Sequence, residues 1–282
     1  MVRKHSPKKQ KLMRGMHSPK GTLIIIGGHE DRTPDSAILK EVAKKVGRGK
    51  LVISTLASQT QASELWRLYK RVFTKLGVKN IVHLSGDSRE DCLKPDKIMR
   101  VTGAKAVFFT GGDQLSLAAY LGGTVLCERI REIYHKGGLI AGTSAGASVL
   151  AEHMIIEGHA DESHRVENVM ALGPGIGVIT DVIIDQHFAE RGRIGRLLGA
   201  VAENGKYLGI GIDEDTALII RQGREARAIG SGAVYLLDAQ ESTHTNVSHR
   251  DEGVTLSIFN LKMHVLSKGD TFNIDRRMPS GH

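Results

Sequence analysis

Short apolar runs alternate with amphipathic segments through the first half of this chain, and this alternation restricts the folds available to it. Residues 22–27 form a continuous apolar run bounded by glycines, which is typical of a strand buried on both faces. The apolar residues of 36–46 then fall on one face of a helix. Further strands are predicted at 51–55, 80–84 and 104–110, with helices at 62–76 and 125–135. This order predicts an α/β fold with a mainly parallel, doubly wound sheet.

The C-terminal third changes character, because strands dominate it. An apolar strand at 182–184 leads through residues 185–188 into a predicted helix at 189–203. Beyond it we expect strands at 216–221, 226–230, 233–237, 254–261 and 263–267, as antiparallel additions to the same sheet or its edge. No internal repeat and no Pro- or Ser-rich linker interrupts the chain. We therefore predict one domain over residues 21–275, with tails at 1–20 and 276–282.

The positive charge of the chain is concentrated at its N-terminus. The formal net charge is +8, and residues 1–20 hold seven Lys or Arg and no acidic residue, which leaves about +1 for the rest. This basic segment has few large apolar residues, so a solvated, disordered tail is expected there. A near-neutral body does not favour nucleic acid as a partner.

Three further observations bear on the compartment. No apolar run reaches the roughly 18 to 20 residues of a membrane span, so no membrane partner is expected. The N-terminus lacks the apolar centre of a signal peptide. The only cysteines, Cys92 and Cys127, are expected to be free thiols in a reducing cytoplasm, although a single disulfide is an alternative.

The segment Gly137–Leu150 carries the strongest chemical signal. It comprises a short apolar strand, the Gly-x-Ser-x-Gly turn from Gly142 to Gly146, and a small-residue helix start. A turn this tight leaves no room for flanking side chains, and it lifts the Ser144 hydroxyl clear of the sheet, as a nucleophile requires. The helix N-terminus behind it offers amide N–H groups to an oxyanion. The alternative is a glycine-rich turn with a surface serine.

A serine nucleophile needs a histidine base that is held by a carboxylate. His187 is preferred because it ends an apolar strand and opens a helix, at the sheet edge where Ser144 is expected. His29 lies at the same edge and is the main rival. Spacing does not choose the acid: the candidates are Asp185, on the same side of its strand as His187, and four loop residues, Glu157, Asp161, Glu162 and Glu167.

Two other segments offer groups for a substrate. In the turn Gly111–Gln114, paired glycines allow a backbone N–H to approach a carbonyl, and Gln114 can hydrogen-bond an amide. The same turn is also explained by Asp113 capping the next helix. After His187, a substrate carboxylate could be held by one or more of three arginines, Arg191, Arg193 and Arg196.

Neither a cofactor nor a metal is expected. The glycines of 173–177 precede a strand rather than a helix, so they do not fit a dinucleotide fingerprint. No Walker loop and no Cys/His cluster with zinc spacing is present. The triplet His29-Glu30-Asp31 could bind a metal, but a lone triplet is a weak signal.

Four ordered motifs give a resemblance to a known family: Phe108–Gln114, Ile140–Ala147, Asp185–Leu198 and Gly209–Ala217. Together they resemble the cyanophycinases, serine peptidases related to aspartyl dipeptidase, over about residues 21–275. The resemblance implies a flavodoxin-like or class I glutamine-amidotransferase-like fold, with serine in place of the amidotransferase cysteine, and a homodimer. It also implies hydrolysis of cyanophycin, a poly-aspartate with arginine on each side-chain carboxyl, to β-aspartyl-arginine dipeptides.

The resemblance also implies roles for individual residues. Ser144 matches the nucleophile and His187 the base, and Glu162 best fits the position of the acid, with Glu157 or Glu167 as alternatives. Gly112 and Ala145 match the amides of the oxyanion hole. The expected substrate pocket comprises Gln114, Asp185, Gln186 and Arg196. Two other functions stay open: a dipeptidase of the same clan acting on short aspartyl peptides, and a non-catalytic binding protein with this fold.

Overall fold

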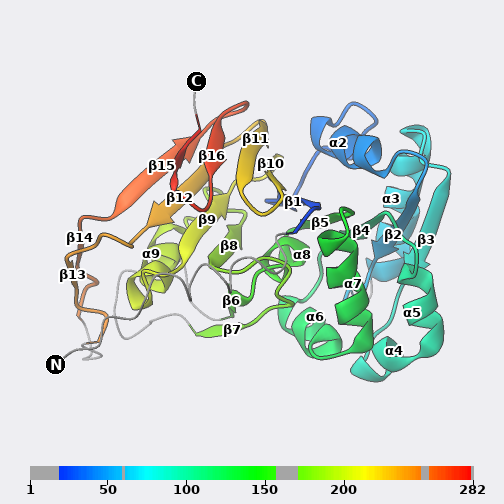
Figure 1. Cartoon of the computed structure of the whole chain (residues 1–282), viewed down its shortest axis with the longest axis horizontal. Coiled ribbons are helices and arrows are strands. Elements are labelled where there is room, and N and C mark those ends of the chain that lie inside the picture. The colour runs from blue at the N-terminus through cyan, green and yellow to red at the C-terminus, as the bar shows by residue number, and fades with distance from the viewer. Residues whose placement is uncertain (1–18, 59–60, 157–170, 249–253, 281–282) are drawn as a thin grey trace, which may run out of the picture.

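The computed structural model describes residues 19–58, 61–156, 171–248 and 254–280. Within these residues, nine strands form the main sheet in the order β17-β16-β11-β10-β1-β5-β4-β2-β3 (Figure 1). Its parallel part comprises β1 (Thr22–Ile26), β5 (Leu139–Thr143), β4 (Ala106–Phe109), β2 (Lys50–Ser54) and β3 (Asn80–Leu84). Its antiparallel part comprises β10 (Thr216–Arg221), β11 (Glu225–Gly230), β16 (Thr271–Asn273) and β17 (Met278–Pro279).

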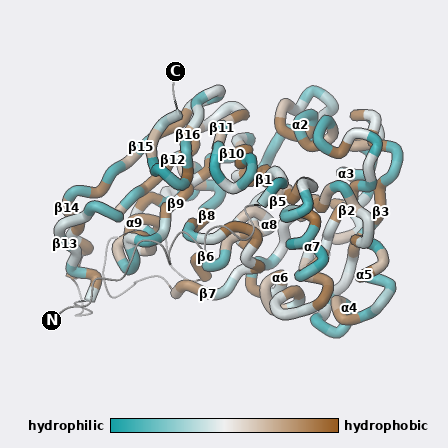
Figure 2. Tube along the Cα trace, in the orientation of Figure 1, coloured by the Kyte–Doolittle hydropathy of each residue, from teal (hydrophilic) through white to brown (hydrophobic). Residues whose placement is uncertain are grey.

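Helices cover both faces of the parallel part, because alternate residues of each buried strand point to opposite faces. On one face, Ile24 and Phe108 pack with the apolar sides of α2 (Ala37–Val46) and α3 (Ala62–Lys75). On the other, Leu23 and Phe109 pack with α6 (Gln114–Leu121) and α7 (Val125–His135), beside the short helices α4 (Arg89–Leu93) and α5 (Pro95–Val101). Figure 2 shows hydrophilic and hydrophobic residues alternating along α2 and α7, as this packing requires.

A second sheet of four strands lies beside the first, in the order β15-β12-β9-β8. Its strands are β8 (Val182–Gln186), β9 (Leu208–Ile212), β12 (Val234–Asp238) and β15 (Lys262–Leu266), and β8 and β9 are parallel. Helix α9 (Ile194–Glu203) packs on one of its faces. Two short ribbons complete the described strands: β6 (His153–Ile155) with β7 (Leu172–Pro174), and β13 (His244–Thr245) with β14 (Ile258–Phe259).

The predicted α/β architecture is confirmed, with its parallel sheet and C-terminal antiparallel strands. The expectation that all late strands join or flank one sheet was wrong for β12 and β15, which pair within the second sheet. The predicted strand at 254–261 was also too long, because only Ile258–Phe259 pairs as β14. There the side chain of Asn246 bonds the backbone of Thr255 and Ser257, and Asn260 ends the strand at a φ of 60°.

The two sheets meet where several strands end, and this junction positions the functional residues. The backbone N–H of His187, just after β8, donates to Gly27 O after β1 at 2.8 Å. The N–H of Asp215, after β9, donates to Gly28 O at 2.9 Å. The carboxyl ends of β1, β5, β8 and β9 therefore converge, which is where open α/β sheets place their ligands. No described helix is long and apolar enough to cross a membrane.

Candidate active site

The Ser144 turn has the strained geometry of a nucleophile elbow. Ser144 lies between β5 and the short helix α8 (Ala145–Ser148), with φ 54° and ψ −127°. A side chain at Gly142 would place its Cβ 2.1 Å from Gly146 O, so the glycine expected there is required by space. Strain of this kind persists only where surrounding structure enforces it. Here the Ser144 N–H is held by Ile26 O, at 3.1 Å.

The buried carboxylate of Glu30 holds the strand end that leads into the Ser144 turn. Glu30 is 2% exposed and accepts hydrogen bonds from the hydroxyls of Thr143, at 2.6 Å, and Tyr69. Thr143 directly precedes the nucleophile, so this bond fixes the end of β5. The Asp31 carboxylate accepts hydrogen bonds from Thr33 instead of facing Glu30.

The two predicted oxyanion amides come from different segments: Ala145 directly follows Ser144, and Gly112 lies in the turn after β4. Ala145 is the first residue of α8, so its N–H has no partner within the helix. Gly112 follows β4, and both residues line the same cavity as Ser144. Gly112 has a φ of 129°, and a Cβ there would lie 2.5 Å from Ala57 O, which explains the glycine. The arrangement allows two backbone N–H groups to face a carbonyl oxygen that is attacked by Ser144.

His187 is placed as a base for Ser144. Its Nε2 lies 2.9 Å from Ser144 Oγ, and the residue is 3% exposed. The turn after β8 gives it a φ of 49°, and the following turn ends with Gly192, so α9 begins at Ile194 rather than at the predicted residue 189. Gly28 packs against the ring so closely that a Cβ there would lie 2.3 Å from His187 Cε1. The imidazole is thus held in one orientation.

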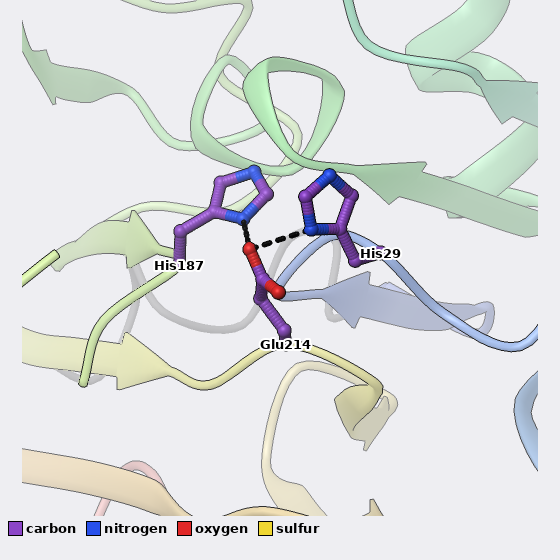
Figure 3. A group of neighbouring side chains, drawn as sticks. All are labelled: His29, His187 and Glu214. Carbon is purple, nitrogen blue, oxygen red and sulfur yellow. Dashed lines mark hydrogen bonds and ion pairs between the residues drawn. The ribbon is translucent and has the colours of Figure 1, made fainter. Parts of the chain in front are cut away.

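Glu214 supplies the carboxylate on the far side of this imidazole. Its Oε1 lies 2.6 Å from His187 Nδ1 (Figure 3). Glu214 follows β9, the parallel neighbour of β8, so the two side chains emerge from adjacent strand ends. A carboxylate at Nδ1 fixes the proton there and leaves the Nε2 lone pair facing the serine hydroxyl.

A second histidine shares the same carboxylate oxygen. His29 Nδ1 lies 2.7 Å from Glu214 Oε1, and the His29 and His187 rings meet edge to face with centroids 5.1 Å apart (Figure 3). The side chain of His29 is 65% exposed, and that of Glu214 is 26% exposed. His29, the rival base in sequence terms, therefore contacts the acid rather than the nucleophile.

Burial and hydrogen bonding determine the charge states of His187 and Glu214. Burial lowers the pKa of His187 from its ordinary value of 6.5, partly offset by the hydrogen bond that its Nδ1–H donates to Glu214, so the imidazole is neutral at pH 7. Burial acts to raise the pKa of Glu214, but the hydrogen bonds from His29 and His187 outweigh it and hold that pKa below its usual value. A neutral imidazole beside a carboxylate is the state that a general base requires.

A cavity of about 390 Å³ opens beside the serine and is bordered by arginines. Gln186, Arg191, Arg193 and Arg196 line it. Asp185 is 1% exposed and pairs with two of these arginines. It accepts two hydrogen bonds from Arg196, of which the one from Nε is 2.6 Å long, and one from Arg193 at 3.2 Å. Asp113 also lines the cavity, so three guanidinium groups face two carboxylates there, and the excess of positive charge suits an anionic group on a ligand.

The structure places most of the predicted site residues together. Ser144, His187, Gly112, Ala145, Gln114, Gln186 and Arg196 lie at or around this cavity. Gln114 donates from Nε2 to Ile155 O at 2.6 Å, and Asp185 holds the arginines instead of lining the cavity. Glu162, Glu157, Asp161 and Glu167 lie outside the described residues.

Sequence reasoning gave Glu214 no role, although it lies inside the quoted motif Gly209–Ala217. A usable signal was present: Glu214 follows an apolar strand just as His187 does. The four loop acids at positions 157–167 were candidates because their loop directly follows the helix after Ser144. Pairing of β8 with β9 is what brings Glu214 to the site, and that pairing was not predicted.

Comparisons with known proteins identify the family of this chain. The model of Peptidase family S51 matches residues 23–229. The cyanophycinase of Trichormus variabilis is 36% identical over 274 residues, which are 96% of this chain and 92% of the relative. The cyanophycinase of Synechococcus elongatus is 35% identical over 257 residues, 90% of this chain and 80% of the relative.

A similar fold occurs in the crystal structure of a peptidase from an acI-B1 actinobacterium. That structure has a TM-score of 0.67 and 23% identity, and the match covers 92% of this chain and 99% of the other. The sequence resemblance to cyanophycinases is confirmed by the relatives above. The family match includes Ser144, His187 and Glu214. This chain belongs to peptidase family S51 and is a hydrolase.

Proposed function

We propose that this protein is a serine-type exopeptidase that hydrolyses cyanophycin to β-aspartyl-arginine dipeptides. The single observation that carries the proposal is the continuous chain of hydrogen bonds from Ser144 Oγ through His187 to Glu214, with contacts of 2.9 and 2.6 Å. The names of the relatives supply the substrate class. An intact nucleophile and base argue against the alternative of a non-catalytic binding protein.

The proposed reaction is acyl transfer through these residues. His187 Nε2 accepts the Ser144 proton as Oγ attacks the carbonyl carbon of a backbone aspartyl amide. The N–H groups of Gly112 and Ala145 hold the resulting oxyanion. Collapse of this tetrahedral intermediate breaks the C–N bond, and His187 protonates the leaving amine. A water molecule then gives a proton to His187 and attacks the carbonyl carbon of the acyl-enzyme. His187 returns that proton to Ser144 Oγ as the acyl C–O bond breaks, which frees the product and restores Ser144.

We propose Glu214 as the acid of this triad, in place of Glu162. Glu214 holds the Nδ1 proton of His187 directly and is itself held by two histidines. Its lowered pKa keeps it ionised at neutral pH, which stabilises the imidazolium that forms during each turnover.

The arginine-bordered cavity supports an anionic substrate group next to Ser144. Each unit of cyanophycin carries a free arginine carboxylate, because the arginine is joined through its amino group. Arg196 and Arg193, braced by Asp185, offer guanidinium N–H groups to such a carboxylate. We further propose that the enzyme acts as a homodimer, as the resemblance implies, and in the cytoplasm, where the free, buried Cys92 and Cys127 are stable.

Separate incubation with cyanophycin and with α-aspartyl dipeptides tests the substrate class. We expect the rate of dipeptide release from the polymer to exceed the rate of α-aspartyl dipeptide hydrolysis by at least about 100-fold, which is about 2.7 kcal/mol in transition-state binding. Chromatographic assays of both substrates at equal enzyme concentration measure this ratio. Faster hydrolysis of the α-aspartyl dipeptides would favour the dipeptidase alternative.

The packing of Gly28 on His187 gives a further prediction. We expect Gly28→Ala to lower kcat/KM on cyanophycin by at least about 100-fold, because the new Cβ displaces the imidazole from Ser144. Gly77→Ala is the matched control, since Gly77 also has positive φ, +88°, but has no atom within 4 Å of the added Cβ. Steady-state kinetics of both variants measure the difference. Equal activity in the two would refute the positioning role of this contact.

A further inference from the structure

We propose that His29, His187 and Glu214 form a binding site for one zinc-like divalent cation, and that its occupation switches the peptidase off. The metal site rests on the geometry of three side chains, whereas the inhibition rests on the function proposed above. The cation is an inhibitor here and takes no part in peptide hydrolysis.

The donor set matches what such a cation prefers. Each of the three residues offers one ligand atom, and these atoms all lie within 4.8 Å of one another (Figure 3). Two imidazole nitrogens and one carboxylate oxygen are a common protein ligand set for Zn²⁺, with the fourth position left to water. Nitrogen donors disfavour Mg²⁺ and Ca²⁺, which select oxygen ligands.

Small side-chain movements convert the hydrogen-bonded group into a coordination site. Donors around tetrahedral zinc lie roughly 3.3 Å apart, given bond lengths of about 2.0 to 2.1 Å. Glu214 Oε1 is now 2.6 Å from His187 Nδ1 and 2.7 Å from His29 Nδ1, so the donors must separate slightly. His187 is fixed by burial, whereas the exposed side chain of His29 and the partly exposed Glu214 have room to move. That exposure also opens a path from solvent.

Inhibition follows from the tautomer that the cation imposes. A neutral imidazole carries one proton, and the Glu214 carboxylate, which can only accept, holds that proton on Nδ1 of His187. A cation bound at Nδ1 moves that proton to Nε2, which then faces Ser144 Oγ as a donor. His187 can no longer accept the serine proton, and Glu214 is engaged by the metal.

His29 is the residue that completes the site, because His187 and Glu214 alone provide only two donors. The other acids near it accept hydrogen bonds elsewhere: Glu30 from Thr143 and Tyr69, Asp31 from Thr33, Asp215 from Ser231 and the Asp31 N–H, and Glu190 from the Glu214 N–H. Removal of His29 should therefore weaken metal inhibition while the Ser144–His187–Glu214 contacts remain. Each variant is compared with its own metal-free rate, so any change in basal activity cancels.

Zinc titration of the full-length enzyme tests this inference. We expect Zn²⁺ to inhibit cyanophycin hydrolysis and His29→Ala to raise the half-inhibitory concentration at least tenfold. His244→Ala, which removes an exposed histidine on β13, should leave it unchanged. Calorimetric titration with Zn²⁺, and the visible absorption of tetrahedral Co²⁺, report binding without any turnover. We expect the wild type to show one site per chain that His29→Ala lacks.

Two results would overturn the inference: the same half-inhibitory concentration in the wild type and His29→Ala, or no calorimetric site that depends on His29. Both leave the proposed function intact if the metal-free enzyme hydrolyses the polymer. If the metal-free enzyme is inactive on cyanophycin while the His29-dependent site binds Zn²⁺, the proposed function fails and the metal site stands.

Discussion

Replacement of Ser144 by alanine is expected to lower kcat on cyanophycin by about 10⁴-fold or more, because no other group forms the acyl bond. The fold should persist, since the positive φ at position 144 is already adopted by a residue with a Cβ and alanine adds no atom. Steady-state assays give the activity, and thermal unfolding gives the stability.

Labelling with a serine-reactive fluorophosphonate provides the control for this variant. The wild type should gain one adduct on the peptide that contains Ser144, and Ser144→Ala should gain none at that peptide. Turnover within tenfold of the wild type in Ser144→Ala would show that another group is the nucleophile.

The second large effect is expected for Glu214→Gln, which should lower kcat by roughly 10²- to 10⁴-fold. The amide keeps the shape of the side chain but removes the charge that stabilises the His187 imidazolium, and its NH₂ group can face Nδ1 and reverse the tautomer. KM should change far less than kcat, because Glu214 contacts the base and not the cavity beside Ser144.

Glu162→Gln is the matched comparison, because the sequence resemblance favours Glu162 for the same role. We expect Glu162→Gln to retain activity within a few-fold of the wild type. Kinetics of the two variants on the same substrate decide between the acids. A large loss in Glu162→Gln together with a small one in Glu214→Gln would return the role to Glu162.

The positions of Ser144 and His187 could be predicted because their signals are local. Steric exclusion requires glycine at positions 142 and 146, and this demand is visible within five residues of sequence. His187 comes three residues after the apolar run 182–184, which is long enough only for a short buried strand, so its place just beyond a strand end follows from the sequence. The parallel sheet was predictable for the same reason, since β1, β4 and β5 are continuous buried runs and β2 is buried over four of its five residues.

The acid could not be chosen in this way, because its position depends on strand pairing between distant segments. Glu214 reaches His187 only because β9 lies parallel to β8, with an intervening helix, in a second sheet that the sequence pattern did not reveal. The same limit applies to Asp185. Its spacing correctly placed it near His187, but the ion pairs that turn it toward Arg193 and Arg196 depend on how α9 packs.

Analysis of the products from cyanophycin tests the central claim most directly. The full-length wild type, incubated with the polymer, should release β-aspartyl-arginine as the major product, identified by mass spectrometry and by comparison with the authentic dipeptide, and Ser144→Ala should release none. Free arginine with an intact poly-aspartate chain would mean that the side-chain bond is cleaved instead. That result, or an unchanged polymer, would contradict the proposed reaction.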